Sequence, residues 1–265
     1  MSDSNYQRQE RLNSFGDTPA EPTTTTKFSE PPIPKNQSNI ELTNPIETLE
    51  AIEDQTGDIR NWLSYIQDHY EPPSHVDTLI LYPCASTKPM CESNTYQALA
   101  ETLDQYSVEK KRRTHILTVS EPFGLIPYEL QQGDFVYDNP GLFRWWCKEN
   151  DQQWDENAQQ MALQILGEHI GGFLKRASEN SWYETELACV RHLTAQGNTS
   201  IDQTHRQMLE TAESVANVDL TWLPTEDVVT TLTDERSAMA WQMKGVSHEV
   251  VQTELAKHLD RAFEG

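Results

Sequence analysis

The segment V-D-T-L-I-L-Y, Val76 to Tyr82, is a compact apolar run bounded by Pro73 and Pro83. A short apolar run between such breakers is typical of a strand that is buried on both faces of a sheet. A helix that Ser93 can cap follows it, and then a second apolar run, H-I-L-T-V, from His115 to Val119. This order predicts a βαβ unit, in which two parallel strands are joined by a right-handed crossover.

The rest of the chain continues the alternation of strands and helices. Leu187 to His192 and Leu220 to Leu223 are candidate third and fourth strands, and a long amphipathic helix is expected from Glu156 to Arg176. Gly171-Gly172 either weakens the middle of that helix or marks a close packing contact, and closing helices are expected from Thr233 to Phe263. The pattern predicts a three-layer α/β domain with a mostly parallel central sheet of about four strands covered by helices.

Composition divides the chain near residue 40. Residues 1–40 are polar, with four consecutive threonines and a Pro-Pro-Ile-Pro run, and we expect them to form a disordered tail. Residues 41–265 are expected to form a single α/β domain with a helical C-terminal extension. Asn44 and Pro45 suit the cap and the first turn of its first helix.

The chain carries 42 acidic and 20 basic residues, for a formal net charge of −22. Phosphate binding relies on Lys and Arg, so a chain this acidic should repel nucleic acid at low salt. Either the acidic surface serves solubility in a salt-rich cytoplasm, as in a halophile, or the protein needs a basic partner. The one basic cluster, Lys110 to Arg113, either contacts phosphate or is a solvated loop.

No run of 18 or more apolar residues occurs, and the first residues lack the apolar core of a signal peptide. We therefore expect a cytoplasmic protein without a membrane partner. Cys84, Cys91, Cys147 and Cys189 are too scattered for a Cys-x-x-Cys zinc site or a disulfide framework. Because no metal, flavin or nucleotide motif is present, we expect no metal and no bound cofactor.

Ligands of open α/β sheets bind at the carboxyl ends of the strands, and two unusual segments are expected there. The first, Pro83 to Ser93, carries Cys84, Ser86 and Lys88 next to a predicted helix N-terminus. Such a terminus lowers the pKa of a thiol and favours anions. The alternative is an ordinary proline-bounded loop with a buried, inert Cys84.

The second segment, Ser120 to Glu129, follows the second predicted strand. Gly124 and the flanking prolines predict a fixed turn, which holds the polar groups of Tyr128 and Glu129 just behind it. The alternative is a turn that only starts a helix, with Glu129 supporting its first turn.

Together the two segments resemble the central domain of archaeosine synthase and its relatives. That family carries Pro-Cys, three residues, Lys-Pro-Tyr, two residues, Ser, two residues and His. In this chain Pro83-Cys84, Lys88-Pro89-Met90, Ser93 and Tyr96 stand at those places. Met90 therefore replaces a tyrosine and Tyr96 replaces a histidine, which removes the commonest general acid/base near pH 7.

Two further stretches are similar to the family. Its Ser-Pro-Leu-Gly-Leu-Val-Pro-Arg-Glu-Leu-like turn is matched by Glu121 to Leu130, and its Tyr-Asp-Ile-Pro by Val136 to Pro140, which includes Asp138. The resemblance covers residues 76–195. The chain has no room for the transglycosylase-like and RNA-binding domains of full-length relatives, so it resembles a divergent, stand-alone version.

The resemblance implies an archaeal transferase that adds an amine such as lysine to the nitrile of 7-cyano-7-deazaguanine in tRNA, or in modified DNA. Cys84 is then the candidate nucleophile, which forms a thioimide as its thiolate. Lys88 would stabilise the anionic nitrogen, Ser93 would donate a hydrogen bond, and Glu129 would hold the amine. The substrate-binding residues implied in this way are Pro83, Ser86, Tyr96, Gly124, Tyr128 and Asp138.

Two other hypotheses stay open. In the first, the chain is a non-catalytic nucleobase- or nucleic-acid-binding module that lost part of the motif, such as an accessory subunit. In the second, it is a glycosylase-like domain. Without an RNA-binding domain, docking on nucleic acid would need a partner protein. His169, His192 and His205 lack metal-ligand spacing, and we expect them to be surface or core histidines.

Overall fold

The computed structural model describes residues 31–32, 40–85, 87, 90–131, 139–190, 203–232 and 245–264. Most of the predicted tail of residues 1–40 lies outside these ranges, so its disorder stays a prediction. The same holds for residues 233–244, at the start of the predicted closing helices.

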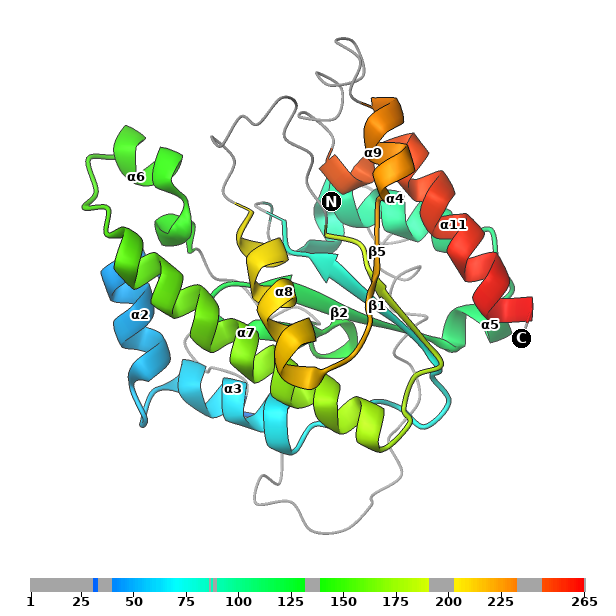
Figure 1. Cartoon of the computed structure of the whole chain (residues 1–265), viewed down its shortest axis with the longest axis horizontal. Helices are drawn as coiled ribbons and strands as arrows, with labels where there is room; N and C mark the ends of the chain where they lie inside the picture. The colour runs from blue at the N-terminus through cyan, green and yellow to red at the C-terminus, as the bar shows by residue number, and fades with distance from the viewer. Residues whose placement is uncertain are drawn as a thin grey trace.

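The described residues form one five-stranded sheet in the order β3-β2-β1-β4-β5 (Figure 1). The strands are β1 (Thr78–Pro83), β2 (Thr114–Ser120), β3 (Gly124–Pro127), β4 (Thr185–Ala188) and β5 (Thr221–Trp222). β1 pairs in parallel with β2 on one side and with β4 on the other, and β5 pairs in parallel with β4. The predicted fold class, α/β with a mostly parallel sheet, is confirmed.

One strand was not predicted. The segment after β2 was expected to be only a turn, but Gly124, at φ +66°, reverses the chain into β3. β3 runs antiparallel to β2, with Gly124 opposite Ser120 and Pro127 opposite Leu117. The four residues G-L-I-P are too few to show a strand period. Pro127 lacks a backbone N–H, which suits the edge position that β3 occupies.

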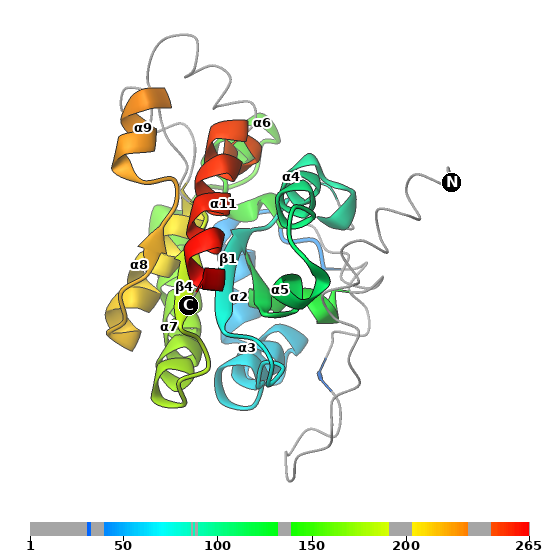
Figure 2. The same cartoon turned by 90° about the vertical axis from the view of Figure 1, so that its right-hand side faces the viewer.

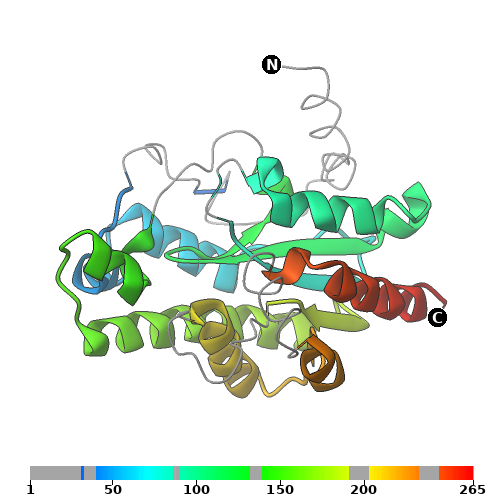
Figure 3. The same ribbon diagram turned by 90° about the horizontal axis from the view of Figure 1, so that it is seen from above.

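Two layers of helices enclose the sheet (Figures 2 and 3). One layer consists of α2 (Pro45–Glu53), α3 (Asp58–Asp68), α7 (Glu156–Glu179) and α8 (Thr204–Ala216). The other consists of α4 (Asn94–Leu103), α5 (Val108–Arg112) and α11 (Glu249–Glu264). The remaining described helices are α6 (Arg144–Glu149), α9 (Glu226–Leu232) and the 3-10 turns η2 (Met90–Glu92), η3 (Tyr128–Leu130), η4 (Pro140–Leu142) and η6 (Gly245–Ser247).

Side-chain caps set the starts of several of the described helices, α2, α4 and α7 among them. Asn44 accepts a hydrogen bond from the backbone N–H of Glu47 in α2, which confirms the predicted cap. Ser93 accepts one from Tyr96 in α4, and Asp155 caps α7 in the same way. Each cap satisfies a backbone donor that the helix leaves free at its first turn.

The sheet and both layers share one hydrophobic cluster, whose members run in sequence from Ile52 to Phe263. Tyr82 of β1 is fully buried in it. Its hydroxyl donates to the backbone oxygen of Thr95 (3.1 Å) and accepts from Nε2 of Gln252 in α11 (3.0 Å). The polar end of this core ring is thereby satisfied, and it ties α4 and α11 to β1.

Adjacent glycines allow α7 to pack closely on two neighbouring helices. A Cβ at Gly171 would lie 2.7 Å from Cβ of Val215 and 3.0 Å from the backbone oxygen of Ala212, both in α8. A Cβ at Gly172 would lie 2.6 Å from Cγ of Gln67 in α3. Of the two interpretations of Gly171-Gly172, close packing is the one that the structure supports.

We expect Gly171→Ala to lower the free energy of unfolding by about 1–3 kcal/mol, because the backbone of α8 must move to admit the methyl group. The matched control is Lys175→Ala, on an exposed position of the same helix, which should change stability by less than about 0.5 kcal/mol. Denaturant unfolding measures both. Equal stability of Gly171→Ala and the wild type would show that the space between α7 and α8 at Gly171 can admit a methyl group.

A buried polar network lies near the amino end of β2. Nδ1 of His115 lies 2.6 Å from the hydroxyl of Tyr183, and its Nε2 lies 2.9 Å from that of Tyr70 and 3.4 Å from Oε1 of Glu129. Tyr70 also donates a hydrogen bond to Glu129, and the rings of Tyr70 and Tyr183 both stack on His115. The network joins β2 to η3 and to the segments after α3 and before β4.

Glu129 is held ionised by this network. Burial alone would raise the pKa of its carboxyl, but the interaction with His115 and the hydrogen bonds from His115 and Tyr70 outweigh burial and hold the pKa below its ordinary value of 4.5. A carboxyl whose pKa is lowered by folding stabilises the protein above its ordinary pKa. This stabilisation is lost as the pH falls through the lowered value.

We therefore expect Glu129→Gln to lower the free energy of unfolding at pH 7 by about 1–3 kcal/mol. The difference from the wild type should narrow as the pH falls below about 4.5. Denaturant unfolding at a series of pH values measures it, with Glu179→Gln on the exposed end of α7 as the control. A difference that does not depend on pH would mean that Glu129 contributes packing only.

Candidate functional site at the carboxyl ends of the strands

The carboxyl ends of β1, β2 and β4 lie side by side. The backbone N–H of Cys84, just after β1, donates to the oxygen of Val119 in β2 (2.9 Å), and that of Cys189, just after β4, donates to Leu81 in β1 (2.9 Å). The helix that follows β1 lies on one face of the sheet, and the one that follows β4 lies on the other (Figure 3). Such a switch point is where open α/β sheets bind ligands.

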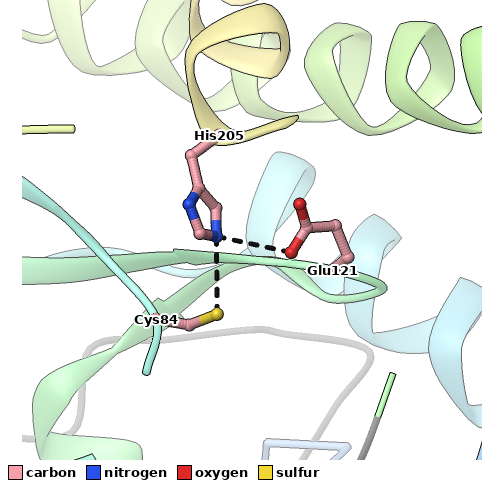
Figure 4. Close-up of side chains that lie close together, drawn as sticks. All are labelled: Cys84, Glu121 and His205. Carbon is pink, nitrogen blue, oxygen red and sulfur yellow. Dashed lines mark hydrogen bonds and ion pairs between the residues drawn. The ribbon is translucent and has the colours of Figure 1, made fainter. Parts of the chain in front are cut away.

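Three reactive side chains meet at this place: Cys84, Glu121 and His205 (Figure 4). Sγ of Cys84 lies 3.4 Å from Nε2 of His205, and Oε2 of Glu121 lies 3.3 Å from the same nitrogen. Cys84 follows β1, Glu121 follows β2, and His205 is the second residue of α8. The three residues follow three different strands, and the pairing of those strands in the sheet brings them together.

The pair of Glu121 and His205 is buried and charged. Their side chains are 2% and 9% exposed. Burial opposes the charge on His205, but the neighbouring Glu121 and Cys84 outweigh it and raise the pKa of the imidazole to about 10. Burial likewise opposes the charge on Glu121, but His205 holds the pKa of that carboxyl below its ordinary value. At neutral pH an imidazolium therefore faces both a carboxylate and the sulfur of Cys84.

This arrangement suits nucleophilic chemistry at sulfur. A cation next to a thiol favours the thiolate, which is the reactive form of cysteine. Glu121 and Cys84 both contact Nε2, so they share one N–H of His205 rather than binding opposite sides of the ring. The proton on Nε2 can therefore pass to a substrate atom near the sulfur, and Glu121 stabilises the ring for as long as it carries that proton.

A polar pocket of about 540 Å³ opens beside the sulfur. Its walls come from the segment after β1, from one side of α4 and from Ser247. Cys84, Thr87, Ser93, Asn94 and Glu101 are among its lining residues. Its volume lies within the usual range for small-molecule sites.

Two predicted site residues lie beside Cys84. Ser93 lines the same pocket, where its side chain also caps α4. Pro83 is the last residue of β1 and directly precedes the cysteine. Ser86, Lys88 and Asp138, the other polar residues predicted here, lie outside the described residues.

The predicted aromatic residues belong to the core. The hydroxyl of Tyr96, which is fully buried, pairs with that of Thr118 in β2. Tyr128 stacks on Tyr96 with ring centroids 6.0 Å apart, and burial raises the pKa of both phenols. Gly124 makes the turn from β2 to β3 and packs near Leu63. None of these three predicted residues is among those that line the pocket.

Glu129 lies away from Cys84. Because β3 runs back along β2, Glu129 follows it to His115, four residues before Val119. Four residues of a strand span about 13 Å. Glu129 is therefore not placed to hold an amine at the sulfur of Cys84, and its partners are Tyr70 and His115.

Sequence reasoning missed His205 and gave no role to Glu121. His205 was taken for a surface or core histidine, because no spacing links it to another reactive residue. The signal that could have found both is topological: each follows a parallel strand of the same sheet, so both come to the edge that carries Cys84. Cys, His and Glu are also residue types that bind metal ions, so their arrival at one sheet edge is a second signal that sequence reasoning could have used.

We expect Cys84 to be the most readily alkylated cysteine of the four. Burial and Glu92 raise the pKa of Cys91, and Cys147 and Cys189 are buried. Replacing His205 with Gln should slow alkylation of Cys84 by iodoacetamide at pH 7 by roughly tenfold, because it removes the adjacent positive charge. Peptide mass spectrometry measures the rate at each thiol.

The control for this experiment is His258→Gln, in α11, where the charged neighbours of the histidine are Arg261 and Glu254. It should leave the rate at Cys84 unchanged. An unchanged rate in His205→Gln would show that His205 does not activate the thiol.

No helix in the described part of the chain is long and apolar enough to cross a membrane.

Comparison with known proteins agrees with the sequence motifs. Archaeosine synthase subunit alpha of Thermococcus kodakarensis is 26% identical over 72 residues, which are 27% of this chain and 13% of that protein. The same subunit of Methanosarcina acetivorans is 29% identical over 104 residues, or 39% of this chain and 15% of that protein. The predicted resemblance to archaeosine synthase is confirmed over this part of the chain, which spans a small fraction of these relatives.

Two further matches concern the fold and the family of the chain. The crystal structure of a protein of unknown function aligns with a TM-score of 0.36 and 18% identity, over 69% of this chain and 48% of the other. A family model described as "Domain of unknown function (DUF5591)" matches residues 59–202. This region is more than half of the 265 residues, and the chain belongs to the DUF5591 family.

Proposed function

We propose that this chain takes part in 7-deazaguanine modification of tRNA and that Cys84 attacks the nitrile of 7-cyano-7-deazaguanine. The contact of Cys84 with His205 carries the proposal, because it is the pairing that a cysteine nucleophile requires. The likeness to archaeosine synthase subunit alpha supports the substrate class.

In the first step the thiolate of Cys84 adds to the nitrile carbon. A carbon–sulfur bond forms, one π bond of the nitrile breaks, and its electron pair goes to nitrogen. The imidazolium of His205 gives that nitrogen its proton, which leaves a neutral thioimide and a neutral imidazole. Glu121 stabilises the imidazolium before the transfer, as an adjacent carboxylate does in other nucleophile–histidine pairs.

In the second step an amine such as lysine adds to the thioimide carbon. The carbon–sulfur bond then breaks, the thiolate of Cys84 is restored, and the proton lost by the amine returns to His205. The product is an amidine. His205 thus supplies the imidazole that the Cys84 motif lacks at Tyr96, and it does so from the other face of the sheet.

The substrate would occupy the pocket beside the sulfur. Ser93 and Glu101 both line this pocket; Ser93 would donate a hydrogen bond to the substrate, and the carboxylate of Glu101 would bind the ammonium group of an amine. Lys88 remains our candidate for stabilising negative charge on the nitrile nitrogen.

Binding of the polynucleotide needs a separate surface. Lys111 and Arg113 form ion pairs with Asp104 and Asp77 beside the start of β2, at the end of the strand opposite Cys84. The net charge of −22 also opposes phosphate binding. We propose that a partner polypeptide docks the tRNA in the cytoplasm and that this chain provides the base-modifying site.

The test starts with the free base, which needs no docking surface. We expect 7-cyano-7-deazaguanine to form an adduct on Cys84 with the full mass of the base, because addition to a nitrile releases no leaving group. Intact-protein and peptide mass spectrometry detect it. Cys84→Ser should abolish the adduct and His205→Gln should reduce it at least about tenfold, whereas Cys91→Ser should keep it.

The complete reaction is followed by nucleoside mass spectrometry of tRNA and of DNA that carry the base, after incubation with the full chain and lysine. A lysine-sized gain on one polymer identifies the substrate. Base binding without any adduct on Cys84 would refute the covalent mechanism and favour the alternative, a non-catalytic base-binding module.

A further inference from the structure

We propose that Cys84, Glu121 and His205 form a binding site for a divalent transition metal, best matched by Zn²⁺. The proposal goes beyond the nitrile chemistry and does not depend on it. It rests on the donor types, on the distances between the donor atoms, and on a buried oxygen of Glu121.

The donor set is that of zinc proteins. A thiolate sulfur, an imidazole nitrogen and a carboxylate oxygen are the three ligand types that zinc takes in proteins, and sites with three protein ligands keep a fourth position for water or substrate. A soft sulfur together with an imidazole disfavours Mg²⁺ and Ca²⁺, which prefer oxygen ligands alone.

The distances also fit. With Zn–S bonds of about 2.3 Å and Zn–N or Zn–O bonds of about 2.0–2.1 Å, the ligand atoms of a tetrahedral site lie roughly 3.3–3.6 Å apart. Here Sγ to Nε2 is 3.4 Å and Nε2 to Oε2 is 3.3 Å. All three donor atoms lie within 4.8 Å of one another.

Glu121 supplies a separate observation. Its side chain is 2% exposed, and its Oε1 has no partner at full hydrogen-bond distance among the described residues, although the hydroxyl of Thr204 lies close enough to interact with the carboxylate. A buried carboxylate oxygen without a hydrogen bond is costly. Coordination of a cation, through either oxygen or both, would offset that cost, and a hydrogen bond to His205 through Oε2 alone does not.

Bound zinc would change what the site can do. A thiolate that coordinates zinc is not free to add to a carbon atom, so zinc and the covalent reaction would compete for the sulfur of Cys84. Since Cys84 also lines the 540 Å³ pocket, a small molecule in that pocket would lie next to the metal.

The experiment uses the full chain, stripped of metal with a chelator, and titrates it with ZnCl₂ against a coloured zinc indicator. We expect one Zn²⁺ per chain, with affinity reduced at least about tenfold in each of Cys84→Ser, Glu121→Gln and His205→Gln. Cys91→Ser and Glu101→Gln, which change a nearby thiol and a pocket carboxylate, should bind as the wild type does. Far-ultraviolet circular dichroism identifies any variant that fails to fold, and the conclusion uses those that do.

A second readout does not depend on affinity. Co²⁺ should give the intense near-ultraviolet absorption of a cobalt–thiolate bond, absent in Cys84→Ser, and Zn²⁺ should protect Cys84 from iodoacetamide. Absence of stoichiometric zinc, or zinc binding unaffected by loss of Cys84 and Glu121, would overturn the proposal. Because no nitrile or amine is present, neither result depends on the proposed reaction.

Discussion

The parallel pairing of β1 between β2 and β4 is the constraint on which the rest of the structure depends. All six residues of β1 are buried, so its backbone groups must find partners in strands on both sides. Once β2 and β4 flank it, the three carboxyl ends coincide and the chain leaves them toward opposite faces. The ladder continues through the N–H of Cys84, which binds Val119. The position of the thiol is therefore set by the sheet and not by a loop.

The parts of this arrangement that could be predicted are those encoded locally. Prolines delimit the β1 run, Ser93 and Asn44 cap helices, and the apolar runs of β1 and β2 mark the βαβ unit. The sequence also placed Cys84 at the carboxyl edge. It could not place His205, because the partners are 121 residues apart and no spacing rule links them. Glu129 was misplaced for a different reason: the short β3 turns the chain back along β2, and four residues carry no readable period.

The charged forms of Glu121 and His205 stabilise each other. A buried carboxylate such as Glu121 or a buried imidazolium such as His205 is costly alone, since each loses its hydration. Together they neutralise each other, and the pair raises the pKa of His205 to about 10 in spite of burial. A purely structural ion pair would consist of these two residues alone. Here a thiol lies against the same nitrogen, so the proton between the carboxylate and the sulfur is held where a third atom can compete for it. That competition is common to nucleophilic catalysis and to metal binding.

The imidazole at the site comes from His205 in α8 and not from the motif around Cys84, which limits what the family likeness can say about this chain. Tyr96, at the motif's histidine position, is buried in the core with its hydroxyl against that of Thr118, and burial raises the pKa of its phenol. His205 fills the gap from α8, three residues beyond the region that matches the family model. The region that matches the family model therefore includes Cys84 and Glu121 and leaves out His205. If the chemistry resembles that of archaeosine synthase, its acid–base group has moved to the other face of the sheet, and the sheet edge, rather than the motif, is what holds the site together.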